Sequence, residues 1–207
     1  TNHESNPSEY NITSAKITLE NPSKANHTFA GWYTDSNCQE KFSYATSTSG
    51  NLILYAKWKA IPYAIHYVLN GGTLAKNSPA TYTIETAVTL MNPSREGYHF
   101  TGWYTDSKCS EDKKITKIEK GRTGKITVYA GWKEYSYTIH FAPNHAMVSG
   151  IQEPMTECAY SKKVTLPKCV YTRPGYEFAG WNTMANGKGT SYADKETVSK
   201  LVSGNNA

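Results

Sequence analysis

The chain has 207 residues, with 22 Lys and Arg against 17 Asp and Glu, which gives a formal net charge of +5. No stretch approaches the ~18 continuous apolar residues of a membrane-spanning helix, so we expect no transmembrane segment. No nucleic-acid-binding motif accompanies the positive charge, so we expect no nucleic-acid partner.

An internal repeat organises the chain. Residues 29–35 read Phe-Ala-Gly-Trp-Tyr-Thr-Asp, residues 100–106 read Phe-Thr-Gly-Trp-Tyr-Thr-Asp, and residues 178–183 read Phe-Ala-Gly-Trp-Asn-Thr. A short β-branched run precedes each block, and a Tyr-Ala-x-Trp block follows the first two, ending at Trp58 and Trp132. Because blocks that recur at a fixed period indicate tandem structural units, the chain is predicted to consist of three modules.

The predicted modules span residues 1–60, 61–134 and 135–207. Only the second contains every block, including an Ile-His-Tyr run at Ile65. The first is expected to lack its first strand and the third its last, so the chain is interpreted as part of a longer array. Modules this small bury a limited core, and the 16 Tyr and five Trp of the chain favour dense ring packing.

The second module defines the expected fold. Alternating and β-branched residues predict strands at 64–69, 81–85, 87–91, 98–104 and 126–132. Ser110 as N-cap, the acidic pair that follows it and Gly121 predict a short helix over 110–121, and Asp194 predicts its counterpart in the third module. The fold class is therefore mainly β or α+β, with small mixed sheets that each carry one short helix.

Two further packing features are expected. Gly102 lies inside a predicted strand, which indicates a bulge or a neighbouring aromatic ring that covers the backbone. The predicted structural core consists of the block tryptophans, which are Trp32, Trp58, Trp103, Trp132 and Trp181.

The blocks together resemble the Listeria–Bacteroides repeat family, which includes the B-repeats of internalins. The resemblance rests on Gly-Tyr-x-Phe-x-Gly-Trp-x-Thr, seen at residues 175–183, and on the Tyr-Ala-x-Trp block, and it covers nearly the whole chain. The first module departs from it at His27, where the others have Tyr98 and Tyr176. The resemblance implies β-grasp-like, non-enzymatic modules at the bacterial cell surface or outside the cell.

The four cysteines do not show zinc-site spacing, so neither a metal nor a cofactor is expected. Cys38 and Cys109 occupy equivalent positions in separate modules and are interpreted as small buried residues. Cys158 and Cys169 flank one predicted strand, and a disulfide between them would suit an extracellular protein. Two free thiols are the alternative, because sequence spacing does not fix disulfide geometry.

No constellation typical of catalysis is present. His66 and His140 occupy the same strand position in different modules, so each module contributes one such histidine, and a solvated strand face is predicted. The sequence also lacks a nucleophile motif such as Gly-x-Ser-x-Gly. We therefore predict no catalytic residues and no enzymatic activity.

The segment from Lys108 to Lys125 contains seven basic and three acidic residues and so carries a net charge of +4. A basic surface there would contact acidic polymers such as glycosaminoglycan or teichoic acid. A solvated basic segment without a partner is the alternative. The candidate polyanion-binding residues are Lys113, Lys114, Lys117, Lys120, Arg122 and Lys125.

Two functional hypotheses follow. The first is a structural spacer or adhesion module of a surface protein. The second is a module that binds carbohydrate or polyanions through exposed aromatic rings or the basic segment. The expected partners are host or cell-wall glycans or proteins. Unpaired strand edges in the first and third modules also predict edge-strand self-association.

Overall fold

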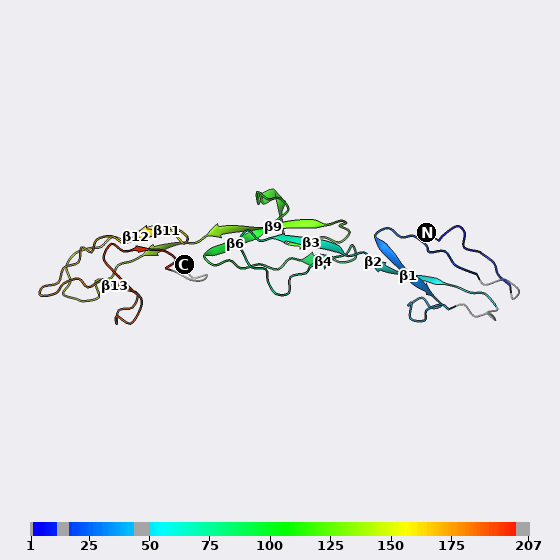
Figure 1. Ribbon diagram of the computed structural model, residues 1–207, viewed down its shortest axis with the longest axis horizontal. Coiled ribbons are helices and arrows are strands. Elements are labelled where there is room, and N and C mark those ends of the chain that lie inside the picture. Colours follow the sequence, from blue (N-terminus) through cyan, green and yellow to red (C-terminus); the bar gives the residue numbers. More distant parts are fainter. Residues whose placement is uncertain (1, 12–16, 44–49, 202–207) are drawn as a thin grey trace. The chain divides into compact units, whose positions relative to one another are not determined.

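Strands connected by turns and irregular segments make up nearly all of the regular secondary structure in the computed structural model, which describes residues 2–11, 17–43 and 50–201 (Figure 1). Within these residues the strands form one five-stranded sheet and five two-stranded sheets. The predicted mainly β class is therefore confirmed.

The first module contains one antiparallel pair, β1 (His27–Tyr33) with β2 (Tyr55–Ala60). The Phe-Ala-Gly-Trp block lies in β1 and the Tyr-Ala-x-Trp block in β2, so that Phe29 faces Trp58 across the pair. Directly opposed aromatic side chains of this kind are a main source of stability in a two-stranded sheet.

The second module forms the five-stranded sheet, in the order β4-β3-β9-β6-β7. Its strands are β3 (Tyr63–Val68), β4 (Thr81–Tyr82), β6 (Tyr98–Tyr104), β7 (Lys114–Ile115) and β9 (Ile126–Glu134). A separate pair joins β5 (Val88–Thr89) to β8 (Lys117–Ile118). The strands predicted at 64–69, 98–104 and 126–132 are confirmed, and those predicted at 81–85 and 87–91 are present but shorter.

The third module repeats part of this plan as three separate pairs. β10 (Ser136–Ile139) pairs with β11 (Met155–Ala159), and β12 (Val164–Thr165) pairs with β15 (Thr197–Val198). β13 (Trp181–Asn182) pairs with β14 (Ser191–Tyr192). By their place in the repeat, β10 corresponds to β3 and β13 to β6, so two strands that belong to one sheet in the second module belong to different sheets here.

The predicted helices are wrong. Residues 110–121 form only a 3-10 turn, η1 (Glu111–Lys113), followed by β7 and β8. The Ser110 hydroxyl does not cap a helix but donates to the Asp106 carboxylate at 2.7 Å. In the third module the Asp194 carboxylate accepts the Cys169 amide, and the chain enters β15. η1 buries no residue, so it does not pack on the sheet as one helix per module requires.

The core is densest in the second module. Trp103, Ile118 and Val128 have the largest fully buried side chains of the described residues. Removing an indole ring and two branched aliphatic chains from water supplies several kcal/mol, at about 1.5–3 kcal/mol for each aliphatic side chain. Among the five predicted core tryptophans Trp103 is buried, and the other four are half-buried.

Gly102 is the site of a bulge. The register between β6 and β9 shifts between Phe100 and Gly102, and Gly102 has φ +150°. A Cβ at this position would lie 2.6 Å from Cε of Lys114, so the side chain that covers the glycine is a lysine and not the expected aromatic ring.

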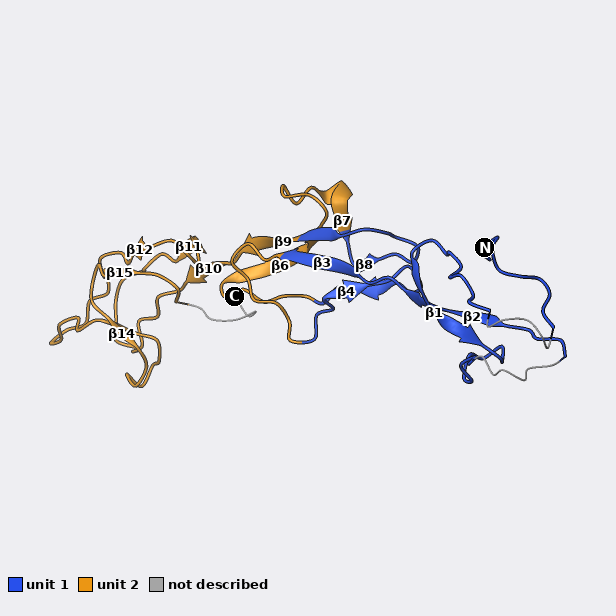
Figure 2. Cartoon of the chain, turned by 45° about the vertical axis from the view of Figure 1, so that its right-hand side comes forward, with its two compact units in different colours: residues 1–67, 77–91, 115–128 blue, residues 68–76, 92–114, 129–207 orange. Residues whose placement is uncertain are grey.

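Two compact units divide the chain (Figure 2). Unit 1 comprises residues 1–67, 77–91 and 115–128, and unit 2 comprises residues 68–76, 92–114 and 129–207. Unit 1 therefore joins the first module to part of the second, and unit 2 joins the third module to the rest of the second. The module boundaries at residues 60 and 134 stay a prediction.

Candidate functional surfaces

Three of the six candidate polyanion-binding residues are paired with neighbouring carboxylates. Lys113 lies 2.9 Å from Asp112, Lys114 lies 3.4 Å from Glu111, and Lys117 lies 3.2 Å from Glu119. Hydrogen bonding to Asp112 raises the pKa of Lys113. Exposed pairs of this kind add little stability, but they neutralise the charge that a polyanion would meet.

The other three candidate cations lie in the turn from β8 to β9, within unit 1. Lys120, Arg122 and Lys125 are exposed, and the ion pairs of the described residues do not include them. Gly121 and Gly124 have φ +87° and +82°, which only glycine adopts readily. Within the candidate set, the positive charge without a carboxylate partner therefore lies in this turn.

The four cysteines are free thiols in the structure, so Cys158 and Cys169 follow the second of the two alternatives that the sequence left open. Cys158 is buried in β11, with its Sγ 3.7 Å from the Met155 carbonyl oxygen. Cys38 and Cys109 are half-buried turn residues with φ 52° and 53°, so they are less buried than expected. Burial and the nearby Asp106 raise the pKa of the Cys109 thiol, which lowers its reactivity.

The histidines of the repeat are solvated. His66 and His140 are both exposed, as predicted. In the described part of the chain, His, Cys, Asp and Glu side chains do not gather in groups of three or more that could hold a metal ion. Over the same residues, none of the helices has the length and apolar character of a membrane span.

The first junction between modules lies within unit 1 and consists of Asn26, His27, Tyr63 and Glu85. The Asn26 carbonyl accepts the amide of Ile61, 3.0 Å away. The Asn26 side chain accepts the Tyr63 hydroxyl at 2.8 Å, and Nε2 of His27 lies 3.4 Å from Glu85. Only residues 61 and 62 separate β2 from β3, so the junction is short and bonded on both sides.

The second junction lies within unit 2 and consists of Glu96, Gly97, Tyr135 and Tyr160. The Gly97 carbonyl accepts the Tyr135 amide at 2.9 Å, which repeats the bond between Asn26 and Ile61 in the first junction. The buried Tyr160 ring lies against Gly97, and its hydroxyl donates to Glu96 at 2.8 Å. This hydrogen bond raises the pKa of the Tyr160 hydroxyl.

A cluster of one Phe and two Trp rings recurs in the first two modules. Phe100 lies 5.5 Å from Trp103 and 5.4 Å from Trp132 by ring centroids, both edge to face. Phe29 makes the same contacts with Trp32 and Trp58. Such pairs add about 0.5–1.5 kcal/mol beyond area burial, which explains why the blocks recur with these residue types.

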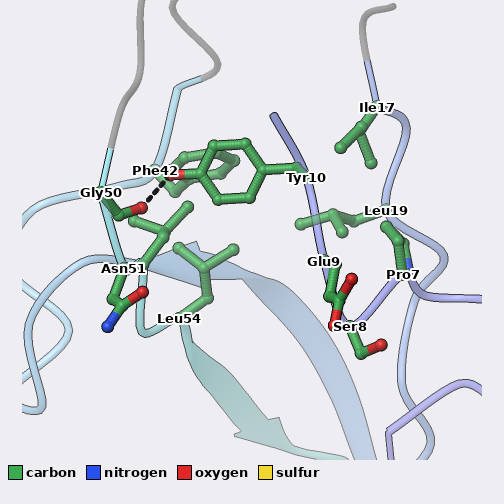
Figure 3. Close-up of a pocket in the computed structure, with 11 residues that line it drawn as sticks. Pro7, Ser8, Glu9, Tyr10, Ile17, Leu19, Phe42, Gly50, Asn51 and Leu54 are labelled. Atoms are coloured by element: carbon green, nitrogen blue, oxygen red, sulfur yellow. Dashed lines mark hydrogen bonds between the residues drawn. The ribbon is translucent and has the colours of Figure 1, made fainter. Parts of the chain in front are cut away.

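The first module contains a cavity of about 490 Å³, within unit 1. The Tyr10 hydroxyl donates to the Gly50 carbonyl at its edge, and Ile17 and Leu19 face Leu54 across it (Figure 3). The same bond recurs in the second module from Tyr82 to the Gly124 carbonyl. There the buried Ile65 of β3 contributes to the core, and the described part of the first module contains no strand equivalent to β3.

The third module contains a larger groove of about 670 Å³, within unit 2. Its walls come from the end of β10 and from the segment around β13. The lining is mainly apolar and aromatic and includes Ile139, Phe141, Tyr171, Phe178, Trp181 and Tyr192. A concave aromatic surface of this volume is within the range of pockets that bind ligands, about 300–1,000 Å³.

The sequence did not reveal the junction residues or the groove. Gly97 sits in a repeated Gly-Tyr dipeptide, which predicts a turn but not that a ring of the next module covers it. The one sequence feature that could have indicated the first junction is Asn26. Asparagine tolerates the φ of 61° found there, and its side chain offers a hydrogen-bond acceptor that glycine lacks. The groove depends on which strands lie next to each other, and the residue pattern within one strand does not specify its neighbours.

The family model described as Listeria-Bacteroides repeat domain matches residues 1–57, 63–131 and 137–204. A protein of Evansella cellulosilytica described as a membrane protein is 36% identical over 181 residues, which are 85% of this chain and 26% of that protein. A second protein of the same organism, described as a Gly-rich membrane protein, is 35% identical over 59% of this chain and 14% of its own length.

Internalin H of Listeria monocytogenes is 31% identical over 111 residues, which are 53% of this chain and 20% of that protein. The chain thus spans about a quarter or less of the length of these relatives. No solved structure shows significant similarity to it.

Proposed function

This chain belongs to the Listeria–Bacteroides repeat family, and we propose that it is a repeat region of a bacterial cell-surface or secreted protein, acting as a spacer or adhesion module. The relatives support a surface location, because they are described as membrane proteins and as an internalin. The family also supports a non-enzymatic role. A β-grasp-like arrangement of the complete module is part of the proposal, supported by its five-stranded sheet.

The recurrent junction contact carries the spacer proposal. In both junctions the first residue after the outgoing strand donates its amide to the carbonyl of the residue that precedes the Phe-x-Gly-Trp strand of the earlier module. These bonds are Ile61 to Asn26, before β1, and Tyr135 to Gly97, before β6. The connections are one or two residues long, whereas flexible tethers are long and rich in Gly and Ser. A spacer needs such junctions, because a free hinge between modules would not maintain a fixed separation.

Spin-label distance measurements test this role one junction at a time, in a variant whose four cysteines are replaced by serine. Labels at Ala30 and Thr116 report on the first junction, and labels at His99 and Thr138 report on the second. All four positions are exposed. We expect distance distributions as narrow as that of a control pair inside the first module, Ala30 with Lys59. Broad distributions at both junctions would contradict a spacer.

A specific observation favours polyanion binding as the second candidate function. Lys120, Arg122 and Lys125 are exposed in one turn and are not matched by carboxylates there. Because the attraction of exposed charges for a polyanion is screened over about 10 Å at 0.1 M salt, binding at this turn would weaken steeply as salt is raised.

Retention on immobilised heparin separates the two halves of the candidate set. Reversing Lys120, Arg122 and Lys125 to Glu should lower the salt concentration of elution. Reversing Lys113, Lys114 and Lys117 changes the charge by the same amount at residues that already have carboxylate partners, and should have the smaller effect. Equal elution of both triple variants and the unmodified chain would exclude the basic segment as a binding site.

A further inference from the structure

We propose that one face of the β1–β2 pair in the first module binds an acidic polysaccharide, whose sugar rings stack on tyrosines and whose anionic groups pair with lysines. We refer to it as the tyrosine–lysine face, and it consists of Tyr33, Lys41, Tyr55, Lys57 and Lys59. An acidic polysaccharide would be the partner of the adhesion role, whereas the spacer role does not depend on it. The basic turn lies in the second module, so either surface can bind without the other.

The register of the two strands brings these side chains together. Tyr33 and Tyr55 are directly opposed across the pair, so their rings leave the sheet on the same side. Lys57 and Lys59 follow Tyr55 at intervals of two residues and therefore lie on that side too. The three β2 side chains are exposed, and Tyr55 is 36% exposed. Two rings and two ammonium groups thus line one open surface.

Lysine side chains contact the Tyr33 ring on this face. Nζ of Lys57 lies 4.8 Å from the ring centroid of Tyr33 and donates to the Cys38 carbonyl at 3.0 Å. A Cβ on Gly31 would lie 3.2 Å from Cε of Lys41 and 3.7 Å from the Tyr33 ring. The Lys41 chain and the Tyr33 ring therefore meet over this glycine, which places a third cation beside the two rings.

The charge of these lysines is not neutralised by ion pairs. The ion pairs of the described residues do not include Lys41, Lys57 or Lys59. The Asp35 carboxylate accepts backbone amides of its own turn, and the amide of Glu40 is the main cause that lowers its pKa. Free ammonium groups attract anions, and the negative face of an aromatic ring attracts the positively polarised C–H groups of a sugar. An acidic sugar offers both features.

The second module has the same positions in a closed arrangement. Gly131 stands where the first module has Lys57, and the Tyr104 ring lies against this glycine and is 2% exposed. A Cβ at position 131 would lie 2.5 Å from that ring, so a lysine there is incompatible with a ring that covers the strand. Lys114, the equivalent of Lys41, pairs with a carboxylate at 3.4 Å. The open face is therefore a property of the first module.

Single-stranded nucleic acid also binds to aromatic rings beside basic side chains. The cell-surface location proposed above favours a polysaccharide, because polysaccharides surround cells, and the choice between the two ligands rests on that location. Nucleic acid is therefore an outcome of the test.

Titration calorimetry of the whole chain with hexagalacturonate tests the proposal. Maltohexaose is the neutral control, and hexathymidylate is the nucleic-acid control. We expect hexagalacturonate to bind more tightly than either control, with an affinity that falls as salt is raised. Equal binding of maltohexaose would show that the lysines do not contribute, and tighter binding of hexathymidylate would assign the face to nucleic acid. Either result would overturn the proposal.

Four variants show whether the ligand occupies this face. Tyr55→Ser should weaken hexagalacturonate binding about three- to tenfold, as expected for one lost ring contact, and Tyr55→Phe should retain the affinity. Lys59→Glu should also weaken binding, whereas Lys133→Glu, the equivalent change in the second module, should not.

Amide NMR signals of β1 show whether each variant is folded, and the two exposed lysine variants decide the outcome if Tyr55→Ser is not. Unchanged affinity in Lys59→Glu, or equal losses in Lys59→Glu and Lys133→Glu, would contradict binding at the tyrosine–lysine face. So would unchanged affinity in a folded Tyr55→Ser variant.

Discussion

The second and third modules share their blocks, yet only the second closes them into one sheet. β9 is the difference, because it joins β3 to β6 and buries Val128 fully, whereas β10 and β13 remain in separate pairs. Equivalent residues consequently have different environments. Trp103 is 1% exposed and Trp181 is half-buried, although both follow the same Phe-x-Gly sequence. The comparison shows that one central strand determines how much of a repeated motif becomes core.

Alanine substitution of Trp103 and of Trp181 should give the largest difference in stability between the second and third modules. Trp103→Ala should lower the free energy of unfolding of the second module by about 3–5 kcal/mol, as expected for a buried indole. Trp181→Ala should cost less than about half of that, because its ring keeps solvent contact. Urea unfolding followed by NMR signals of each module measures both. Equal losses would show that the third module has a complete core.

Two equivalent glycines distinguish the stability that comes from the second junction from the cost of backbone strain. Gly97 and Gly175 both have φ +78°, but a Cβ on Gly97 would lie 1.9 Å from the Tyr160 ring, and one on Gly175 would have no atom within 4 Å. Both alanine variants should therefore lose about 1–2 kcal/mol from the left-handed backbone. Gly97→Ala should lose about 1–3 kcal/mol more from overpacking. Thermal unfolding that is the same for both variants would mean that Tyr160 moves away without cost.

Much of this arrangement could be predicted from the sequence. The alternation in residues 126–132 and the aromatic block at 98–104 identify strands because their side chains must face a core and solvent in turn. The prediction of a helix at 110–121 failed because Ile115 and Ile118 are spaced as on a helix, yet each belongs to a two-residue strand. Ile115 lies in β7 beside β6, and Ile118 lies in β8, which pairs with the more distant β5. Strand adjacency depends on such distant partners, so neither the groove nor the junctions were predictable from local pattern.

Acid should affect the second module differently from the third. The Asp106 carboxylate accepts the Ser110 amide and hydroxyl, which lowers its pKa below the usual 3.8. In the third module Asn182 holds the equivalent turn without a charge. Because the pKa of this carboxyl is lower in the folded than in the unfolded chain, its ionised form stabilises the fold at pH values above the unfolded-state pKa. This stabilisation is lost as the pH falls through the folded-state pKa.

The melting temperature of Asp106→Asn should therefore lie below that of the unmodified chain at about pH 5, and the difference should shrink towards about pH 2. Met184→Ala, at the equivalent position of the third module, is the control and should show no such convergence. A difference for Asp106→Asn that stays constant over this range would show that the carboxylate charge is not responsible.

The smallest expected effect concerns two tyrosine hydroxyls at equivalent positions. The Tyr63 hydroxyl donates to Asn26, so Tyr63→Phe should cost about 1 kcal/mol. The Tyr137 hydroxyl is buried and has no side-chain hydrogen-bond acceptor among the described residues. Gly97 occupies the position at which Asn26 offers such an acceptor to Tyr63. Tyr137→Phe should be neutral or stabilising by up to about 1 kcal/mol. Chemical denaturation of both variants measures the difference, and a larger loss for Tyr137→Phe would contradict it.

Native-state hydrogen exchange tests most directly whether β9 causes the difference between the second and third modules. Amides of β3 and β6 should exchange slowly, through opening of the whole sheet, whereas those of β10 and β13 should exchange through smaller and more frequent openings. Equal protection of the two strand pairs would contradict this explanation.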